Sequence, residues 1–187
     1  MRAFGSPGLA GGKLLVLLAA LALAAPAARA DFVQIVAFGD SLTDAGNVAT
    51  ATGGQFPPAP YSNGRFSNGP VWAQQLASRL GLPALTPSLR GGSDYAFGFA
   101  ETGNGTTTTR VPGLSVPNVG AQIQTYLGSH TPSPNQLFVI WAGANDFFDG
   151  QTNPAVPIHN LVTDLTTLAK AGATHFLVAD LPPLGDT

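Results

Sequence analysis

The sequence predicts an α/β fold in which a parallel sheet is covered by helices on both faces. Segments with helical periodicity alternate with short apolar runs typical of strands, and the run from Leu137 to Ala142 is apolar throughout. Continuously apolar runs are typical of strands buried on both faces. Strands that alternate with helices are joined by right-handed crossovers and therefore run parallel. The carboxyl ends of such strands are where these folds carry their functional sites.

The first strand is expected over residues 32–37, a run rich in β-branched and aromatic residues. The sequence then turns small and polar over residues 38–46, and Ser41 is the first candidate nucleophile in the chain. A serine at the end of a strand has a rigid support and an exposed hydroxyl, which nucleophilic catalysis requires. The alternative is that Ser41 only caps the helix that follows.

A long loop is expected over residues 51–69, because three prolines between positions 57 and 60 exclude a regular helix. Such a loop either shapes a substrate cleft or is a plain surface excursion. The apolar spacing that follows predicts a helix over residues 71–80, ending before Gly81, with Trp72 in the core.

Residues 93–100 are expected to form a second, short strand that breaks at Gly98. The threonine-rich segment 101–111 is of low complexity and is expected to be an exposed loop. An apolar stripe then predicts a second helix over residues 119–127, which ends at Gly128.

The apolar run at residues 137–142 is long enough for a central parallel strand, and Gly143-Ala144-Asn145-Asp146 follows at its carboxyl end. Taken alone, Asn145 has the alternative interpretation of an Asx turn. Leucines at spacings of four and three predict a third helix that begins near Pro157. The last expected strand covers residues 175–180, which makes four strands in total.

Residues 1–30 are expected to be a secretory signal peptide, and residues 31–187 the folded domain. Arg2 and Lys13 precede the apolar run 14–25, and Ala28-Arg29-Ala30 supplies a small-x-small cleavage site. The run is shorter than the ~20 residues that a membrane span needs, although a retained amino-terminal anchor is the alternative. Export therefore predicts a secreted, periplasmic or cell-surface protein with no transmembrane segment in its mature chain.

Composition excludes several classes of function for this domain. Of the eight basic residues, three lie in the expected signal peptide, so five remain against ten acidic residues, a formal charge of −5. A nucleic-acid partner would require a basic stripe instead. The chain has no cysteine, so disulfides, a thiolate nucleophile and zinc–thiolate sites are excluded. No motif indicates a metal or a cofactor, and the oligomeric state is left open.

Three motifs resemble the GDSL, or SGNH, hydrolase family of secreted esterases and lipases. They are Phe38-Gly39-Asp40-Ser41-Leu42-Thr43-Asp44-Ala45-Gly46-Asn47, Tyr61-Ser62-Asn63-Gly64-Arg65-Phe66-Ser67-Asn68-Gly69 and Gly143-Ala144-Asn145-Asp146. The similarity runs from about Val33 to Gly185, in the family's order. It implies a three-layer αβα, flavodoxin-like (SGNH hydrolase) fold, which normally has five central strands where four are recognised here.

The resemblance also implies a role for each of three residues. Ser41 is the nucleophile, and the Ser41 N–H, the Gly98 N–H and the Asn145 side-chain amide form the oxyanion hole. A neutral amide suits that task because it donates hydrogen bonds without a competing charge. The second motif departs from the family, which often has Gly-Gly-Ala where this chain has Gly98-Phe99-Ala100. A shift of one residue in that motif would make the N–H of a neighbouring residue the oxyanion donor.

The acidic residues near these motifs are expected to be supporting residues that accept backbone N–H bonds and shape turns: Asp40, Asp44 and Asp146. The family's base is normally the histidine of an Asp-x-x-His motif, and no histidine here has an aspartate three positions before it. His130 and His175 are expected at the amino-terminal edge of the sheet. His159 is a weak candidate on the catalytic edge.

The domain is therefore expected to be incomplete at its carboxyl end, without the family's catalytic aspartate and histidine. The leading hypothesis is a serine ester hydrolase (an esterase or lipase) that acts on small-molecule or lipid carboxylic esters. The alternative is a non-catalytic exported fragment, or a binding module that keeps the fold.

Overall fold

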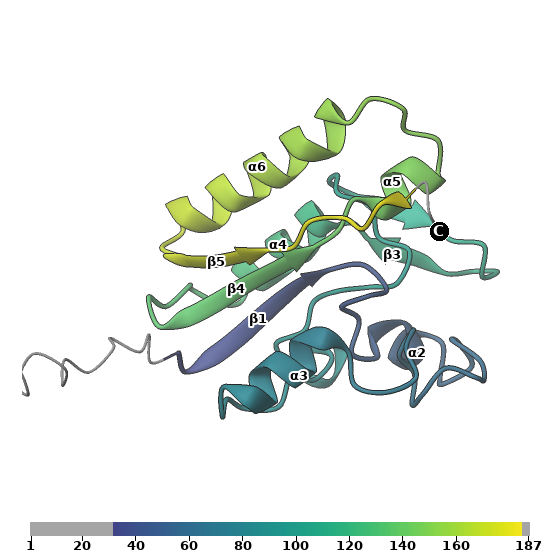
Figure 1. The fold of residues 1–187 in the computed structure, drawn as a ribbon, viewed down its shortest axis with the longest axis horizontal. Coiled ribbons are helices and arrows are strands. Elements are labelled where there is room, and N and C mark those ends of the chain that lie inside the picture. Colours follow the sequence, from purple (N-terminus) through teal and green to yellow (C-terminus); the bar gives the residue numbers. More distant parts are fainter. Residues whose placement is uncertain (1–31, 185–187) are drawn as a thin grey trace, which may run out of the picture. The chain divides into compact units, whose positions relative to one another are not determined.

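The computed structural model describes residues 32–184, and the expected signal peptide lies outside the described residues. Figure 1 shows a sheet with helices packed on it. In chain order the elements are β1 (Gln34–Gly39), α2 (Asn47–Ala51), α3 (Trp72–Arg79), the 3-10 helix η1 (Ser88–Arg90), β2 (Thr106–Thr108), β3 (Ser115–Pro117), α4 (Val119–Leu127), β4 (Gln136–Trp141), α5 (Ala144–Phe148), α6 (Ala155–Lys170) and β5 (His175–Val178).

The main sheet is parallel, with the strand order β1-β4-β5. Gln34 pairs with Gln136 at the start of β1, and Leu137 pairs with His175 at the start of β5. Central β4 is buried from Leu137 to Ile140, as its apolar sequence predicts. The prediction of an α/β fold with a parallel sheet is confirmed.

Two hydrophobic clusters lie on opposite faces of this sheet and define three layers. Val36, Phe38, Phe138 and Ile140 pack with residues of α4 and α6, whereas the alternate residues Ile35, Ala37, Leu137 and Val139 pack with α3. Side chains alternate between the faces of a strand, so each strand supplies both clusters. Trp72 packs against the second cluster, as expected for a core residue.

The expected strand at residues 93–100 is wrong as a regular strand. Residues 93–97 run parallel to β1, with Tyr95 N–H donating to the Ala37 carbonyl at 2.7 Å and Phe97 N–H to the Gly39 carbonyl at 3.1 Å. Only isolated bridges form at this segment, since Asp94 bridges Ala37 of β1 and also Pro87. Asp94 N–H donates to the Thr86 carbonyl at 3.0 Å and its own carbonyl accepts the Ser88 N–H at 2.7 Å. The Asn47 amide adds bonds to the carbonyls of Asp94 and Ala96.

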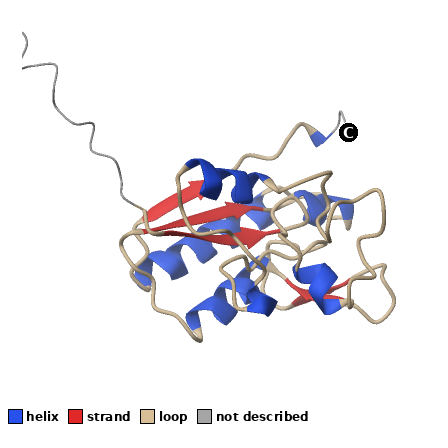
Figure 2. Ribbon diagram, turned by 90° about the horizontal axis from the view of Figure 1, so that it is seen from below, coloured by secondary structure: helices blue, strands red, loops and turns tan. Residues whose placement is uncertain are grey.

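The segment expected to be an exposed loop, residues 101–111, contains strand β2, so the expectation of a loop is wrong there, although β2 is exposed at Thr106 and Thr108. β2 pairs with β3 in a small antiparallel sheet, with Thr106 opposite Pro117. Figures 1 and 2 show this small sheet beyond the carboxyl ends of the main strands. None of the helices in residues 32–184 is long and apolar enough to cross a membrane.

Candidate active site

The turn that carries Ser41 is fixed where β1 ends. Gly39 has a φ of +145°, and a Cβ there would lie 2.2 Å from the Trp141 carbonyl oxygen, so only glycine fits. The buried Gln122 side chain of α4 accepts a hydrogen bond from Gly39 N–H and donates one to its carbonyl, both at 2.9 Å. The backbone before Ser41 is therefore bonded to α4 and lies against the end of β4.

Asp40 holds the turn around Ser41. Its carboxylate accepts the Leu42 N–H at 3.0 Å, and its carbonyl accepts the N–H groups of Thr43 and Asp44. Burial raises the pKa of Asp40 to about 6; the bond from Leu42 opposes this shift and the charge of Asp146 adds to it. The half-buried Ser41 keeps both its hydroxyl and its N–H free of hydrogen bonds to any described residue.

Asp44 joins the Ser41 turn to the segment that runs beside β1. Its buried carboxylate accepts N–H bonds from Gly46, Asn47 and Val48 at the start of α2, and from Gly98 at 3.0 Å. Burial raises the pKa of Asp44, and these four bonds oppose that shift. The bond between the Gly98 N–H and the Asp44 carboxylate joins residues 54 positions apart, so it fixes two motifs of the site against each other.

The Gly98 N–H is thus already bonded to Asp44. A Cβ on Gly98 would lie 2.3 Å from the Phe66 ring, which explains the glycine. The next residue, Phe99, has a φ of +75°, in the left-handed region that aromatic residues rarely adopt. Its N–H makes no hydrogen bond within the described part of the chain.

Asn145 and Asp146 on α5 both contact the segment after Phe99. The Asn145 amide donates to the Ala100 carbonyl at 2.9 Å, and one of its two amide hydrogens remains free. The Asp146 carboxylate accepts the Thr102 N–H at 3.0 Å and the Thr102 hydroxyl at 2.6 Å. The Ser41 turn, the Gly98–Ala100 segment and α5 thus form one hydrogen-bonded group at the carboxyl ends of β1 and β4.

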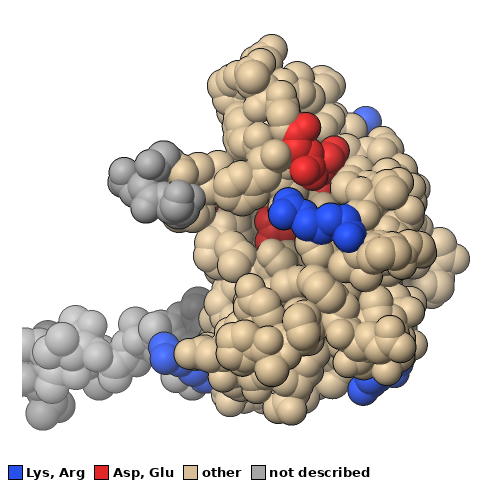
Figure 3. Space-filling model, turned by 90° about the vertical axis from the view of Figure 1, so that its right-hand side faces the viewer, with Lys and Arg blue, Asp and Glu red and all other residues tan. Residues whose placement is uncertain are grey.

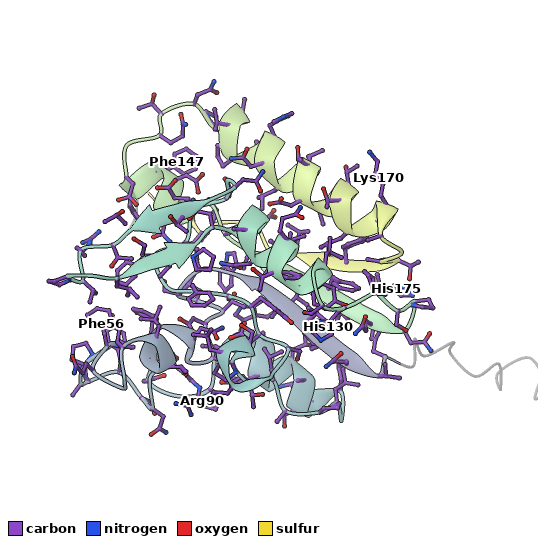
Figure 4. All side chains as sticks on the ribbon, turned by 180° about the vertical axis from the view of Figure 1, so that it is seen from behind. Phe56, Arg90, His130, Phe147, Lys170 and His175 are labelled. Atoms are coloured by element: carbon purple, nitrogen blue, oxygen red, sulfur yellow. The ribbon has the colours of Figure 1, made fainter. Side chains whose placement is uncertain are left out.

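None of the described histidines joins this group. The His130 ring stacks on Tyr126 with centroids 5.1 Å apart, and His175 contacts Phe32 edge to face at 5.3 Å. Figure 4 shows His130 and His175 at the end of the molecule away from Phe56 and Phe147, which lie on the side of the strand ends. His159 is exposed on α6, and its ring makes no hydrogen bond, ion pair or aromatic contact with a described residue.

Three supporting residues escaped the sequence analysis: Asn47, Asp94 and Gln122. Asp94 is fully buried and accepts N–H bonds from Ala45 at 2.5 Å and Ala96 at 3.1 Å. Burial, and then the nearby charge of Asp44, raises the pKa of Asp94 well above its usual value. Of the three, only Gln122 could have been recognised from the sequence, since it is a polar residue on the apolar stripe of the predicted helix, together with Val119 and Tyr126.

The sequence model of the GDSL-like lipase/acylhydrolase family matches residues 35–187. The chain belongs to this family. The match includes every residue of the hydrogen-bonded group described above, so the GDSL family assignment covers the whole candidate site. The fold agrees with this assignment, because it is the α/β arrangement that the resemblance implies.

Curated relatives of this GDSL-family chain include enzymes and a secreted effector. A phosphatidylcholine-sterol acyltransferase of Aeromonas hydrophila is 31% identical over 90% of this chain and 50% of its own length. A thermolabile hemolysin of Vibrio parahaemolyticus is 30% identical over 80% and 34% of the two chains. A secreted effector protein of Salmonella typhimurium is 29% identical over 84% and 36%. The chain thus spans a third to a half of the length of these relatives.

Proposed function

We propose that this chain carries the nucleophile and the oxyanion-binding groups of an exported serine ester hydrolase. The observation that supports it most directly is Ser41, whose hydroxyl and N–H make no hydrogen bond to a described residue, in a turn whose Asp40 N–H donates to the Trp141 carbonyl at the end of β4. Membership of a lipase and acylhydrolase family supports hydrolysis of an ester bond. The apolar run and cleavage site at residues 14–30, together with the secreted relative, support export.

In the proposed reaction, the Ser41 hydroxyl oxygen attacks the ester carbonyl carbon while a base takes its proton. The carbonyl oxygen becomes an oxyanion, which accepts hydrogen bonds from the Ser41 N–H, the Asn145 amide and one N–H of the second motif. The bond to the leaving alcohol then breaks, and the alcohol takes the proton from the base. Water hydrolyses the acyl-serine by the same steps in reverse order.

We assign the third oxyanion donor to Phe99 rather than to Gly98. The Gly98 N–H donates to the Asp44 carboxylate, whereas the Phe99 N–H has no described partner. A donor that is already bonded to a carboxylate is a poor ligand for a second negative charge. The positive φ of Phe99 is the kind of backbone strain that is found at functional sites.

The base is the part of the mechanism that the described residues do not provide. No histidine among residues 32–184 makes a hydrogen bond to the Ser41 turn. We propose that the base belongs to a portion of the protein outside these residues, consistent with the greater length of the curated relatives. The substrate is proposed to be a small-molecule or lipid ester, because the chain belongs to a lipase and acylhydrolase family. Figure 3 shows that the face at the strand ends is mostly uncharged, with acidic and basic side chains gathered near its middle.

Covalent labelling tests the proposal. A phosphonate ester incubated with the active whole protein should add one adduct, which tryptic mass spectrometry locates on Ser41. Ser41→Ala should abolish both the label and ester turnover, and Ser62→Ala in the loop after α2 is the matched control. A label on another residue, or full turnover in Ser41→Ala, would refute the assignment. A whole protein that is never labelled would favour the binding-module alternative.

A further inference from the structure

Four aromatic rings gather next to the Gly98–Ala100 segment: Phe56, Tyr61, Phe66 and Phe99. Phe66 contacts Phe56, Tyr61 and Phe99, and Phe56 also contacts Phe99, with centroid distances of 5.6 to 5.8 Å. Three of the rings come from the loop between α2 and α3. We call this set the aromatic cluster; it packs on a buried apolar cluster that includes Val48 and Phe97.

Phe99 belongs to the aromatic cluster and also presents the free N–H proposed as an oxyanion donor. Its left-handed conformation costs free energy, so the surrounding contacts must hold it there. The contacts present are its ring packing on Phe56 and Phe66. An ester carbonyl bound at the Phe99 N–H would therefore have an aromatic wall beside its acyl side.

Phe56 belongs to this wall and also lines a cavity of about 330 Å³. The cavity lies between the end of α2 and the turn that joins β2 to β3, and Figure 4 shows Phe56 on this side of the molecule. Its lining combines the polar side chains of Thr52 and Gln55 with the apolar ones of Ala51, Phe56, Val111 and Leu114.

The chemistry of this lining selects an uncharged ligand. No lining residue is ionisable. The Thr52 hydroxyl is already bonded, since it accepts the Phe56 N–H at 3.1 Å and lies 2.9 Å from the Val48 carbonyl. A charged group would lose its hydration there with no ion pair to compensate, whereas an apolar group would gain free energy against Phe56, Val111 and Leu114.

We propose that the cavity and the aromatic cluster bind the acyl chain of the ester, and that the preferred acyl group is a straight chain of medium length. The proposal rests on the function proposed for Ser41. The chain would start at the oxyanion donors, pass Phe99 and Phe56, and end against Val111 and Leu114. A volume of about 330 Å³ holds on the order of ten methylene groups, taking each to be about as large as a water molecule at ~30 Å³.

The test measures binding, so it needs neither a base nor turnover. Calorimetric titration of the purified chain with butanamide, hexanamide, octanamide and decanamide gives the dependence of Kd on chain length. Each added methylene is expected to tighten binding by about fourfold, the value for burial of one CH₂ group. Ala51→Trp should fill the cavity and weaken decanamide binding at least tenfold. Ala155→Trp, an exposed alanine at the start of α6, is the matched control and should leave Kd unchanged.

Either of two results would overturn the proposal: affinity that does not rise with chain length, or decanamide binding that Ala51→Trp leaves unchanged. Thermal unfolding of Ala51→Trp at the parent temperature shows that the variant is folded. Failure of the phosphonate to label Ser41, with amide binding retained, would remove the hydrolase function and leave the acyl-binding site. Labelling of Ser41 without length-dependent amide binding would support the hydrolase function and remove the acyl-binding site.

Discussion

The side-chain amide of Asn145 donates a hydrogen bond to the Ala100 carbonyl oxygen at 2.9 Å. This contact joins the first turn of α5 to the segment that carries Gly98 and Phe99. It fixes the plane of the amide and leaves the second amide hydrogen for a ligand. The amide is therefore oriented before any substrate arrives, which is what stabilisation of a developing oxyanion requires.

Asn145→Ala in the active whole protein should lower kcat on the order of 10²–10³-fold, the usual effect of removing one oxyanion donor. KM should change little, because the donor acts mainly in the transition state. Steady-state kinetics on a nitrophenyl ester measures both constants. Asn160→Ala is the matched control, since it also removes an asparagine amide, but one that donates to the Thr102 hydroxyl and has no proposed role in binding the oxyanion. A change confined to KM would make Asn145 a ground-state binding residue.

Asp44→Ala should lower the free energy of unfolding by roughly 3 kcal/mol or more, because several buried N–H groups lose their acceptor at once. Urea unfolding at pH 7 measures this value. Asp149→Ala, at an exposed position near the site, should cost less than about 0.5 kcal/mol. Equal stability of the two variants would show that the Asp44 contacts do not hold the site together.

Asp164 should make stability depend on pH. It is 6% exposed, one carboxylate oxygen has no hydrogen-bond partner in residues 32–184, and burial raises its pKa from 3.8 to about 7. Because the folded-state pKa is the higher one, the folded protein holds this proton more tightly than the unfolded chain does. Stability from this group is complete below pH 3.8 and is lost as pH rises through about 7.

Asp164→Asn should remove that loss and flatten the stability curve between pH 4 and 8, with unfolding measured in urea at each pH. The variant should exceed the parent in stability at pH 8 and lose the advantage near pH 4. Asp180→Asn, at an exposed aspartate, should follow the parent curve. A parallel curve for Asp164→Asn would show that the carboxyl group titrates normally.

The chain itself should show little or no esterase turnover. Ser41 has no base among the described residues, and a neutral hydroxyl is a weak nucleophile. Binding and oxyanion stabilisation alone leave about 10³–10⁴-fold over water in serine proteases that lack a triad member. The assay compares residues 31–187 with Ser41→Ala and His159→Ala on a short-chain nitrophenyl ester. Rapid turnover that His159→Ala abolishes would identify His159 as the base.

Periodicity found the larger elements because their sequences contain enough turns or alternations to count. The helix expected over residues 119–127 is present with those bounds, and the run at 137–142 is the central strand β4. Helices α2 and α5 have five residues each, which is too short for a periodic signal. Strands β2 and β3 have three residues each and also escaped detection.

The site was less visible to the sequence because its key contacts join distant residues. Ser41 and Asn145 could be placed at the ends of strands from the sequence, since each follows an apolar run. Nothing local revealed that the Asp44 carboxylate accepts the Gly98 N–H, or that the Asn47 amide donates to the carbonyls of Asp94 and Ala96. These are buried side-chain bonds across about 50 residues, and only the packed structure determines them.

The Gln122 bonds to Gly39 have a consequence for how the loops of this fold can vary. They tie the backbone before Ser41 to a core helix, while Trp141 blocks movement toward β4. Ser41, the proposed nucleophile, thus follows a backbone that is bonded to the α4 layer and packed against the sheet. If the proposed function is correct, the loop between α2 and α3 can change in length or sequence, and with it the preferred ester, while Ser41 keeps its position.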